Sequence, residues 1–201
     1  PWPYNMSWFQ QQLRRCIELA SSDLHLSCDC LPTFRIKGQI YQDSQFELVQ
    51  AEQLQQVFTD ILTAAQQQLL QDNRQLDMGY SCADQLRFRI NIYYERNRPA
   101  MAIRWLDGSF RSLSELNLPK SLQHLTHLKD GLVLITGATG SGKSTTLASI
   151  INEINRQRHC HILTLEDPIE FVHENHNSVV HQREVGFDVP TYAMGIKAAL
   201  R

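Results

Sequence analysis

The sequence predicts an α/β protein in which an N-terminal α+β module precedes a domain with a parallel sheet. Residues 7–106 mix amphipathic helical patterns with strands of alternating polarity, whereas residues 131–201 run as strand, glycine-rich loop, helix and strand. Asp107-Gly108 marks a turn between these two sequence patterns. Because 201 residues suit two small domains, we place the domains at 7–106 and 131–201, with a linker at 107–130.

The N-terminal module is expected to alternate helices with strands. The spacing of Leu13 and Ile17 predicts a short amphipathic helix over 7–21. A longer helical pattern covers 54–69, where apolar residues follow the helical period and glutamines occupy the solvent side. Alternating polarity predicts strands over 24–26, 34–41, 76–82, 86–94 and 100–106.

The strand predicted at 86–94 has two distinct faces. Its even-numbered residues from 86 to 92 are apolar and share one face, while Arg87, Arg89 and Asn91 share the other. This pattern is typical of a sheet with one buried and one polar face. The linker that follows is rich in leucine and serine and is expected to end in a short helix near Lys129.

Composition argues against several classes of protein. The net charge is -2, without a long basic run, so binding of nucleic acid through a basic surface is not expected. The longest apolar runs, such as 132–135, fall far short of the roughly 20 residues that a membrane span needs. Five widely spaced cysteines fit a reduced cytoplasmic protein better than a disulfide framework.

The glycine-rich loop carries the clearest functional signal. A short apolar stretch, 132–136, is expected to form a buried strand, and Gly137-Ala-Thr-Gly-Ser-Gly-Lys-Ser144 follows it directly. This matches the phosphate-binding P-loop, a motif whose four fixed positions occur by chance in roughly one in a hundred chains of this length. A helix expected over 145–155 supplies the context that the motif requires.

Each part of the loop has a chemical reason. Glycines let backbone N–H groups approach phosphate oxygens without a side chain in the way. Lys143 would reach the β- and γ-phosphates, and the hydroxyl of Ser144 would bind Mg²⁺. The residues expected to bind the nucleotide are Gly137, Ala138, Thr139, Gly140, Ser141, Gly142, Lys143, Ser144 and Thr145.

An acidic turn follows the next predicted strand. That strand, at 161–165, runs into Glu166-Asp167-Pro168-Ile169-Glu170. Ligands of open α/β sheets sit at the carboxyl ends of the strands, so these carboxylates should lie near the phosphates. They could assist Mg²⁺ or orient a water molecule. A solvated acidic turn is an equally open interpretation of this position.

Several segments together resemble the family of secretion and pilus motor ATPases. The resemblance spans 7–201 and looks closest to PilT-type retraction ATPases, because the additional domain that assembly-type relatives usually carry before residue 22 is not seen. The segments that carry it are Ser22–Leu26, Arg35–Gly38, Arg87–Asn91, Gly131–Thr136 with the loop after it, His161–Glu170 and Gln182–Gly186.

The resemblance implies a homo-hexameric ring of two-domain subunits that uses ATP and Mg²⁺. Each subunit would join an N-terminal PAS-like module to a RecA-like P-loop ATPase core, here partial and ending before the Walker B strand that completes the magnesium site. The expected location is cytoplasmic, peripheral at the inner-membrane face, with a pilus or secretion platform protein of the inner membrane as partner.

The resemblance also suggests roles for individual residues. In the family, an acidic segment carries the glutamate that activates water, and Glu170 is the first candidate for this role and Glu166 the second. Family arginines from the N-terminal module close over the nucleotide phosphates, and the matching positions are Arg87, Arg89 and Arg104. An arginine that reaches a transferring phosphoryl group neutralises the charge that develops there.

Three functional hypotheses follow from these observations. The first is an ATP-driven motor for type IV pilus retraction and twitching motility, or for a related assembly or type II secretion system. The second is a noncatalytic nucleotide-binding or subunit-interaction fragment of such a motor. The third is a small-molecule kinase with the same loop, although no substrate lid or catalytic motif for one is visible in the sequence.

Overall fold

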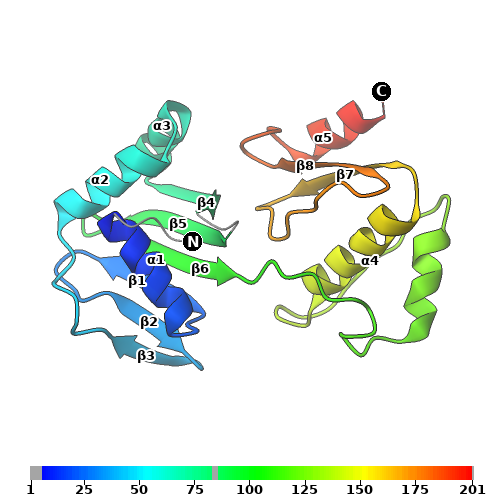
Figure 1. The fold of residues 1–201 in the computed structure, drawn as a ribbon. Coiled ribbons are helices and arrows are strands. Elements are labelled where there is room, and N and C mark those ends of the chain that lie inside the picture. The colour runs from blue at the N-terminus through cyan, green and yellow to red at the C-terminus, as the bar shows by residue number, and fades with distance from the viewer. Residues whose placement is uncertain (1–5, 83–85, 201) are drawn as a thin grey trace. The chain divides into compact units, whose positions relative to one another are not determined.

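A computed structural model describes residues 6–82 and 86–200, which belong to two compact units, Pro1–Asp107 and Gly108–Arg201. The elements of both units are labelled in Figure 1. Helices and strands occur in each unit, so the mixed α/β class that the sequence predicts is confirmed. Among the described helices, none is long and apolar enough to cross a membrane. The PAS-like and RecA-like identities of the units stay predictions.

A six-stranded antiparallel sheet forms the centre of the first unit. Its strands lie in the order β3-β2-β1-β6-β5-β4. The long hairpin of β5 and β6 pairs Phe88 with Trp105 and Ile90 with Ile103. The strands are β1 (Asp23–Ser27), β2 (Thr33–Ile36), β3 (Gln39–Gln42), β4 (Gln75–Ser81), β5 (Arg87–Glu95) and β6 (Arg98–Leu106).

Three helices cover the apolar face of this sheet (Figure 1). They are α1 (Trp8–Glu18), α2 (Ala51–Ile61) and α3 (Ala64–Asn73). The core joins inward-facing strand residues such as Leu24, Phe88 and Ile90 to helix residues such as Leu13 and Leu54, all of them fully buried. Burial of this apolar surface is the main force that holds the helices against the sheet.

Two elements predicted as continuous are divided in the structure. The strand expected over 34–41 is a hairpin of β2 and β3, because Lys37 and Gly38 both adopt positive φ angles, 49° and 83°, and turn the chain back. The helix expected over 54–69 ends at Ile61, and Thr63 begins α3 with a reciprocal capping box in which its hydroxyl accepts from the backbone N–H of Gln66.

The second unit contains a parallel pair of strands and three helices. The strands β7 (His161–Glu166) and β8 (Val179–Glu184) pair in register from His161–Val179 to Glu166–Glu184. The helices are η2 (Lys120–His127, a 3₁₀ helix), α4 (Lys143–Gln157) and α5 (Tyr192–Ala199).

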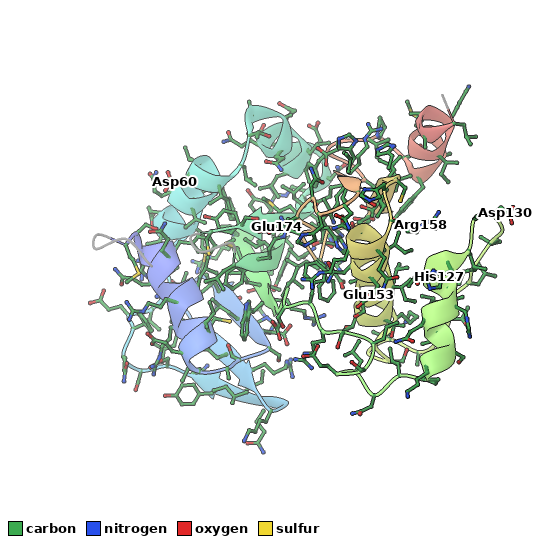
Figure 2. The ribbon with its side chains drawn as sticks, turned by 45° about the vertical axis from the view of Figure 1, so that its right-hand side comes forward. Asp60, His127, Asp130, Glu153, Arg158 and Glu174 are labelled. Carbon is green, nitrogen blue, oxygen red and sulfur yellow. The ribbon has the colours of Figure 1, made fainter. Side chains whose placement is uncertain are left out.

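Side-chain hydrogen bonds tie α4 to its neighbours. Arg158, which follows α4 and is labelled in Figure 2, donates from Nη1 to the carbonyl of Leu128 at 2.7 Å, just beyond the end of η2. Asn155 is fully buried and donates from Nδ2 to the carbonyl of Glu174 at 2.7 Å. These contacts fix the helix relative to η2 and to the loop before β8.

The buried strand expected at 132–136 is not formed, and that prediction is wrong. The segment has no strand assignment, and Leu132 and Leu134 are 82% and 74% exposed. Its apolar sequence is typical of a strand covered on both faces. Among the described residues of the second unit, however, the ladder contains only β7 and β8, so this segment has no strand to pair with.

Candidate functional site

The glycine-rich loop of the second unit has the backbone that phosphate binding requires. Gly140 and Gly142 adopt φ angles of 78° and 86°, in the left-handed region that side chains disfavour. Gly137 has a φ of 155°, and a Cβ at this position would lie 2.7 Å from the hydroxyl oxygen of Ser141. The loop therefore needs glycine for both conformation and space.

The loop leads directly into α4, which begins at Lys143. The N-cap residue is Gly142, which offers no side-chain oxygen to the N–H groups of the first turn. Such a helix start attracts an anion through its free N–H groups and its dipole. Lys143 extends back over the loop and donates from Nζ to the carbonyls of Gly137 and Ala138, at 3.0 and 2.8 Å. Its ammonium group therefore lies on the loop itself.

One pocket of about 380 Å³ brings the loop and the acidic turn together. Ser144 lines it from α4, and Glu166, Asp167 and Glu170 line it from the turn after β7. The expectation that the acidic turn lies near the phosphate loop therefore agrees with the geometry. Hydroxyl and carboxylate oxygens are ligands that Mg²⁺ prefers, but no three acidic, histidine or cysteine side chains of the described residues are grouped so that they could hold a metal ion by themselves.

The two candidate glutamates have different surroundings. Oε1 of Glu166 accepts hydrogen bonds from Oγ1 of Thr164 at 2.6 Å and from Nε2 of Gln182 at 3.0 Å. The carboxylate of Glu170 makes no hydrogen bond or ion pair within the described part of the chain, and its residue is half-buried at the pocket. Glu166 is thus a fixed carboxylate, whereas Glu170 has its oxygens available.

Sequence reasoning missed Thr164 and Gln182. Gln182 donates to the carbonyl of Phe171 at 2.7 Å and accepts from the backbone N–H of His173 at 2.7 Å, in addition to its bond with Glu166. It therefore fastens the loop after the acidic turn to β8. The only signal in the sequence was that Gln182 belongs to a segment that carried the family resemblance.

His173 is a further unpredicted lining residue of this pocket. It is 9% exposed, and its ring centroid lies 4.6 Å from that of Phe110. Its Nδ1 atom is buried without a hydrogen-bond partner among the described residues. Burial lowers the pKa of His173, and the nearby carboxylate of Glu166 opposes this only in part. The imidazole is therefore held neutral.

Acidification is expected to destabilise the second unit through His173. Its pKa in the folded chain is lowered from the unfolded value of about 6.5, so the unfolded chain takes up a proton that the folded chain excludes. The free energy of unfolding should therefore decrease as the pH falls below about 6.5, until the folded pKa is reached.

Thermal melting of the unchanged protein and of His173→Leu, at about pH 7.5 and about pH 5.5, measures this effect on either side of the unfolded histidine pKa. The loss of stability on acidification should be smaller in His173→Leu. His159→Leu is the control, because His159 is exposed. If acid destabilises His173→Leu as much as the unchanged protein, buried His173 is not the cause.

The three candidate arginines lie on the outer face of the sheet in the first unit. Arg89 and Arg104 face each other directly across β5 and β6. Arg89 forms a bidentate ion pair with Asp77, and Arg104 pairs with Asp23 at 2.8 Å. Arg87 donates from Nη1 to the hydroxyl of Ser81 at 2.9 Å. The shared face of Arg87 and Arg89 was predicted, but the position of Arg104 opposite Arg89 and the paired carboxylates were not.

Comparison with known families and solved structures gives a consistent result. The family model described as "Type II/IV secretion system protein" matches residues 6–201. The pilus retraction motor PilT, solved with bound ADP, shares 38% sequence identity with a TM-score of 0.91, over 98% of this chain and 57% of that one. The Legionella pneumophila ATPase DotB shares 28% identity with a TM-score of 0.79, over 100% of this chain and 58% of that one.

Two Pseudomonas aeruginosa proteins are similar in sequence. The type IV pilus ATPase PilU is 33% identical over 193 residues, covering 96% of this chain and 50% of the relative. The type IV pilus retraction ATPase PilT is 34% identical over 181 residues, covering 90% of this chain and 52% of the relative. The chain thus spans about half the length of these relatives.

Proposed function

Because the chain belongs to the family of type II/IV secretion system proteins, we propose that it binds and hydrolyses ATP as part of a pilus or secretion motor. The specific form of the proposal is a homo-hexameric motor for type IV pilus retraction, with assembly or type II secretion as the related alternative. The observation that carries it is a pocket lined both by Ser144, the last residue of the glycine-loop motif, and by the acidic turn, next to a loop that has the backbone phosphate binding requires.

The proposed chemistry assigns a role to each part of the pocket. Backbone N–H groups of Gly137–Thr145 hold the phosphates, and the ammonium group of Lys143 moves from the loop carbonyls to the phosphate oxygens. The hydroxyl of Ser144 would hold Mg²⁺, which would neutralise charge on the phosphates. Glu170 accepts the proton of the attacking water, because its carboxylate makes no hydrogen bond or ion pair with another residue that the structure describes.

The arginines of the first unit complete the proposal. We assign to Arg87, Arg89 and Arg104 the task of stabilising charge on the transferring phosphoryl group. The proposed ring works at the cytoplasmic side of the inner membrane, in contact with a pilus or secretion platform protein. In this scheme the first unit is the PAS-like module and the second is part of the RecA-like core.

The direct test of the proposal is ATP binding by Lys143→Ala. A charge-assisted contact to phosphate contributes about 1.5–3 kcal/mol, so affinity for ATP with Mg²⁺ should fall by about 10- to 100-fold. Isothermal titration calorimetry measures the change. Lys120→Ala removes the same charge from the start of η2, outside the loop, and should bind as the unchanged protein does. Equal affinity in a folded Lys143→Ala protein would remove the assignment of the loop.

A further inference from the structure

A row of charged side chains crosses the polar face of the sheet in the first unit. Strand register places Asp23 of β1 between Arg35 of β2 and Arg104 of β6. The row continues to Arg89 of β5, which lies opposite Arg104. Asp77 of β4 closes it through its ion pair with Arg89. Two arginines therefore lie side by side, with one carboxylate on each outer flank.

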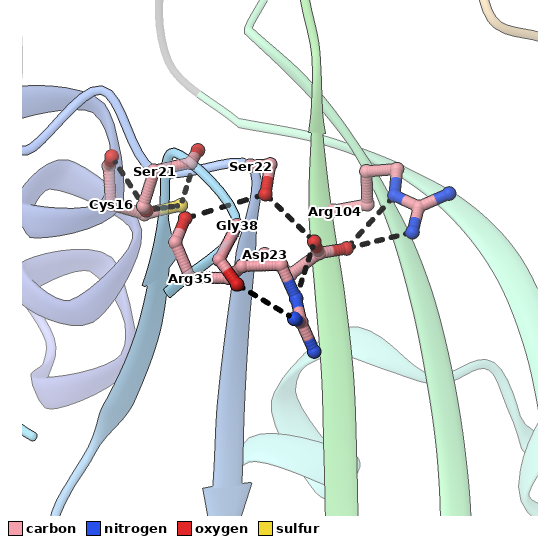
Figure 3. A network of polar contacts seen from close by, with 7 residues as sticks. All are labelled: Cys16, Ser21, Ser22, Asp23, Arg35, Gly38 and Arg104. Carbon is pink, nitrogen blue, oxygen red and sulfur yellow. Dashed lines mark hydrogen bonds and ion pairs between the residues drawn. The ribbon is translucent and has the colours of Figure 1, made fainter. Parts of the chain in front are cut away.

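Asp23 is the centre of one half of this row (Figure 3). Its Oδ1 accepts from Nε of Arg104 at 2.9 Å, and Nη2 of the same guanidinium lies 2.8 Å away. Its Oδ2 accepts from the hydroxyl of Ser22 at 2.8 Å and lies 3.5 Å from Nε of Arg35. The Asp23 side chain is only 13% exposed, while that of Arg104 is 61% exposed. A fixed carboxylate thus holds an arginine that reaches into solvent.

The charge state of Asp23 agrees with this arrangement. Burial alone raises the pKa of a carboxyl group, but hydrogen bonds from Ser22 and Arg104 outweigh it, and the pKa of Asp23 is lowered overall. Asp23 is therefore ionised at neutral pH, as its partner Arg104 requires.

Asp77 performs the corresponding task for Arg89. Nε of Arg89 donates to both carboxylate oxygens of Asp77, at 3.2 and 3.0 Å, and Nη2 donates to Oδ2. This is the planar, two-bond contact that fixes a guanidinium most firmly. In both pairs the carboxylate engages the Nε and Nη2 edge of the arginine.

Arg89 and Arg104 are neighbours of like charge, and their ion pairs with Asp77 and Asp23 offset the repulsion between them. Like charges directly opposite each other on paired strands destabilise a sheet. Here Arg89 and Arg104 are directly opposite, and a pocket of about 260 Å³ lies over them and their two carboxylates. Two adjacent guanidinium groups held beside a pocket form a site suited to an anion with several oxygen atoms.

We propose that Asp77 and Asp23 are positioning residues that hold the guanidinium groups of Arg89 and Arg104 side by side to receive phosphate oxygens. The proposal rests on the proposed function, which gives these arginines their phosphate-facing role. An unpaired arginine samples many rotamers, and ordering it on binding costs about 0.5–1.5 kcal/mol. Asp77 and Asp23 already order the two arginines in the folded protein, so this cost is not added when the anion binds.

Two variants at Asp77 distinguish the loss of arginine positioning from the loss of the negative charge of Asp77. Asp77→Asn and Asp77→Ala remove the same charge, but the asparagine carbonyl still accepts a hydrogen bond from Arg89, whereas alanine does not. The probe is inorganic tripolyphosphate, and the readout is the arginine Nε–H signals in NMR spectra of the full chain. These signals report rigidity through the heteronuclear NOE and affinity through their shifts on titration.

Asp77→Ala is expected to bind tripolyphosphate up to about tenfold more weakly than Asp77→Asn, the factor set by ordering one long side chain. The Nε–H group of Arg89 should stay rigid in Asp77→Asn and become mobile in Asp77→Ala. Asp60→Ala is the charge-matched control, because Asp60 is an exposed residue of α2 whose carboxylate accepts a hydrogen bond from the neighbouring side chain of Gln56. The same comparison at Asp23 tests Arg104 and provides a second pair of variants.

Equal affinity of the alanine and asparagine variants, or tighter binding by alanine, would overturn the positioning role. The proposed function is tested separately by the backbone N–H signals of Gly137–Thr145 in the same titration. If those signals respond but the arginine signals do not, the positioning proposal fails while the nucleotide assignment stands. If the arginines respond but the loop does not, the nucleotide assignment fails instead.

Discussion

ATP hydrolysis is expected to fall by about 100- to 10,000-fold when Glu170 is replaced by glutamine, the range typical of losing a general base. An amide of the same shape cannot accept the proton of the attacking water. ATP binding should be retained, because the proposed phosphate contacts come from the loop of Gly137–Thr145 and not from the acidic turn. The expected signature is a loss in kcat with little change in KM.

The hydrogen bonds around the acidic turn are the reason to place Glu170 before Glu166. Oε1 of Glu166 already accepts from Thr164 and Gln182, so its carboxylate is oriented within the pocket wall. We expect Glu166→Gln to disturb this network and to lower turnover less than Glu170→Gln. The order would be reversed if Glu166 were the base and Glu170 only a solvated side chain.

The measurement is steady-state ATP turnover of each variant, and ATP binding is followed in parallel by calorimetry. Glu174→Gln is the matched control, because Glu174 is an exposed glutamate on the loop before β8, where its backbone carbonyl accepts a hydrogen bond from Asn155. Its turnover should equal that of the unchanged protein. If Glu170→Gln retains turnover while Glu166→Gln loses it, the two assignments must be exchanged.

Local sequence signals predicted most elements of the fold, and tertiary partners decided the rest. The alternation in 86–94 predicted both the strand and its two faces, because each face meets a different environment. The sequence does contain a capping signal at the helix break, Thr63 with Gln66 three residues later. The continuous apolar period across 54–69 nevertheless led to the prediction of one helix. The hairpin at Lys37-Gly38 was concealed in the same way by continuous alternation.

The segment at 132–136 shows what the sequence could not decide. Its composition is that of a buried strand, but a strand forms only where a neighbour supplies hydrogen-bond partners. The structure describes no strand beside it, and Leu132 and Leu134 are exposed. The loop that follows still has the conformation its glycines predict, because that conformation depends on local φ angles and not on the sheet.

The same distinction between local signals and tertiary partners holds for the residues of the candidate site. Spacing in the sequence was enough to select Gly137, Lys143 and Ser144, since the motif is contiguous. The supporting partners come from elsewhere in the chain: Gln182 lies on a different strand from Glu166, and Asp77 on a different strand from Arg89. Alternation along a strand predicts which residues share a face, but register fixes which of them meet.

Replacement of Phe88 by alanine is expected to lower the free energy of unfolding of the first unit by about 3–5 kcal/mol, the range for deleting a buried aromatic ring. Phe88 is completely buried on β5, with Tyr80 of β4 and Trp105 of β6 as its register partners. It therefore lies inside the sheet, where neighbouring strands limit how far the cavity can collapse. A loss of this size is a large fraction of the roughly 5–15 kcal/mol that stabilises a typical domain.

Urea unfolding followed by tryptophan fluorescence reports on this unit, because the three tryptophans of the chain, at positions 2, 8 and 105, all precede the second unit, which starts at Gly108. Tyr41→Ala is the control, since Tyr41 is an aromatic residue of the same sheet that is 43% exposed on β3. It should change stability by no more than about 0.5 kcal/mol. The midpoint should shift at constant slope, because the same surface is exposed on unfolding. A shift for Phe88→Ala no larger than that for Tyr41→Ala would mean that the apolar face of β5 does not form the core.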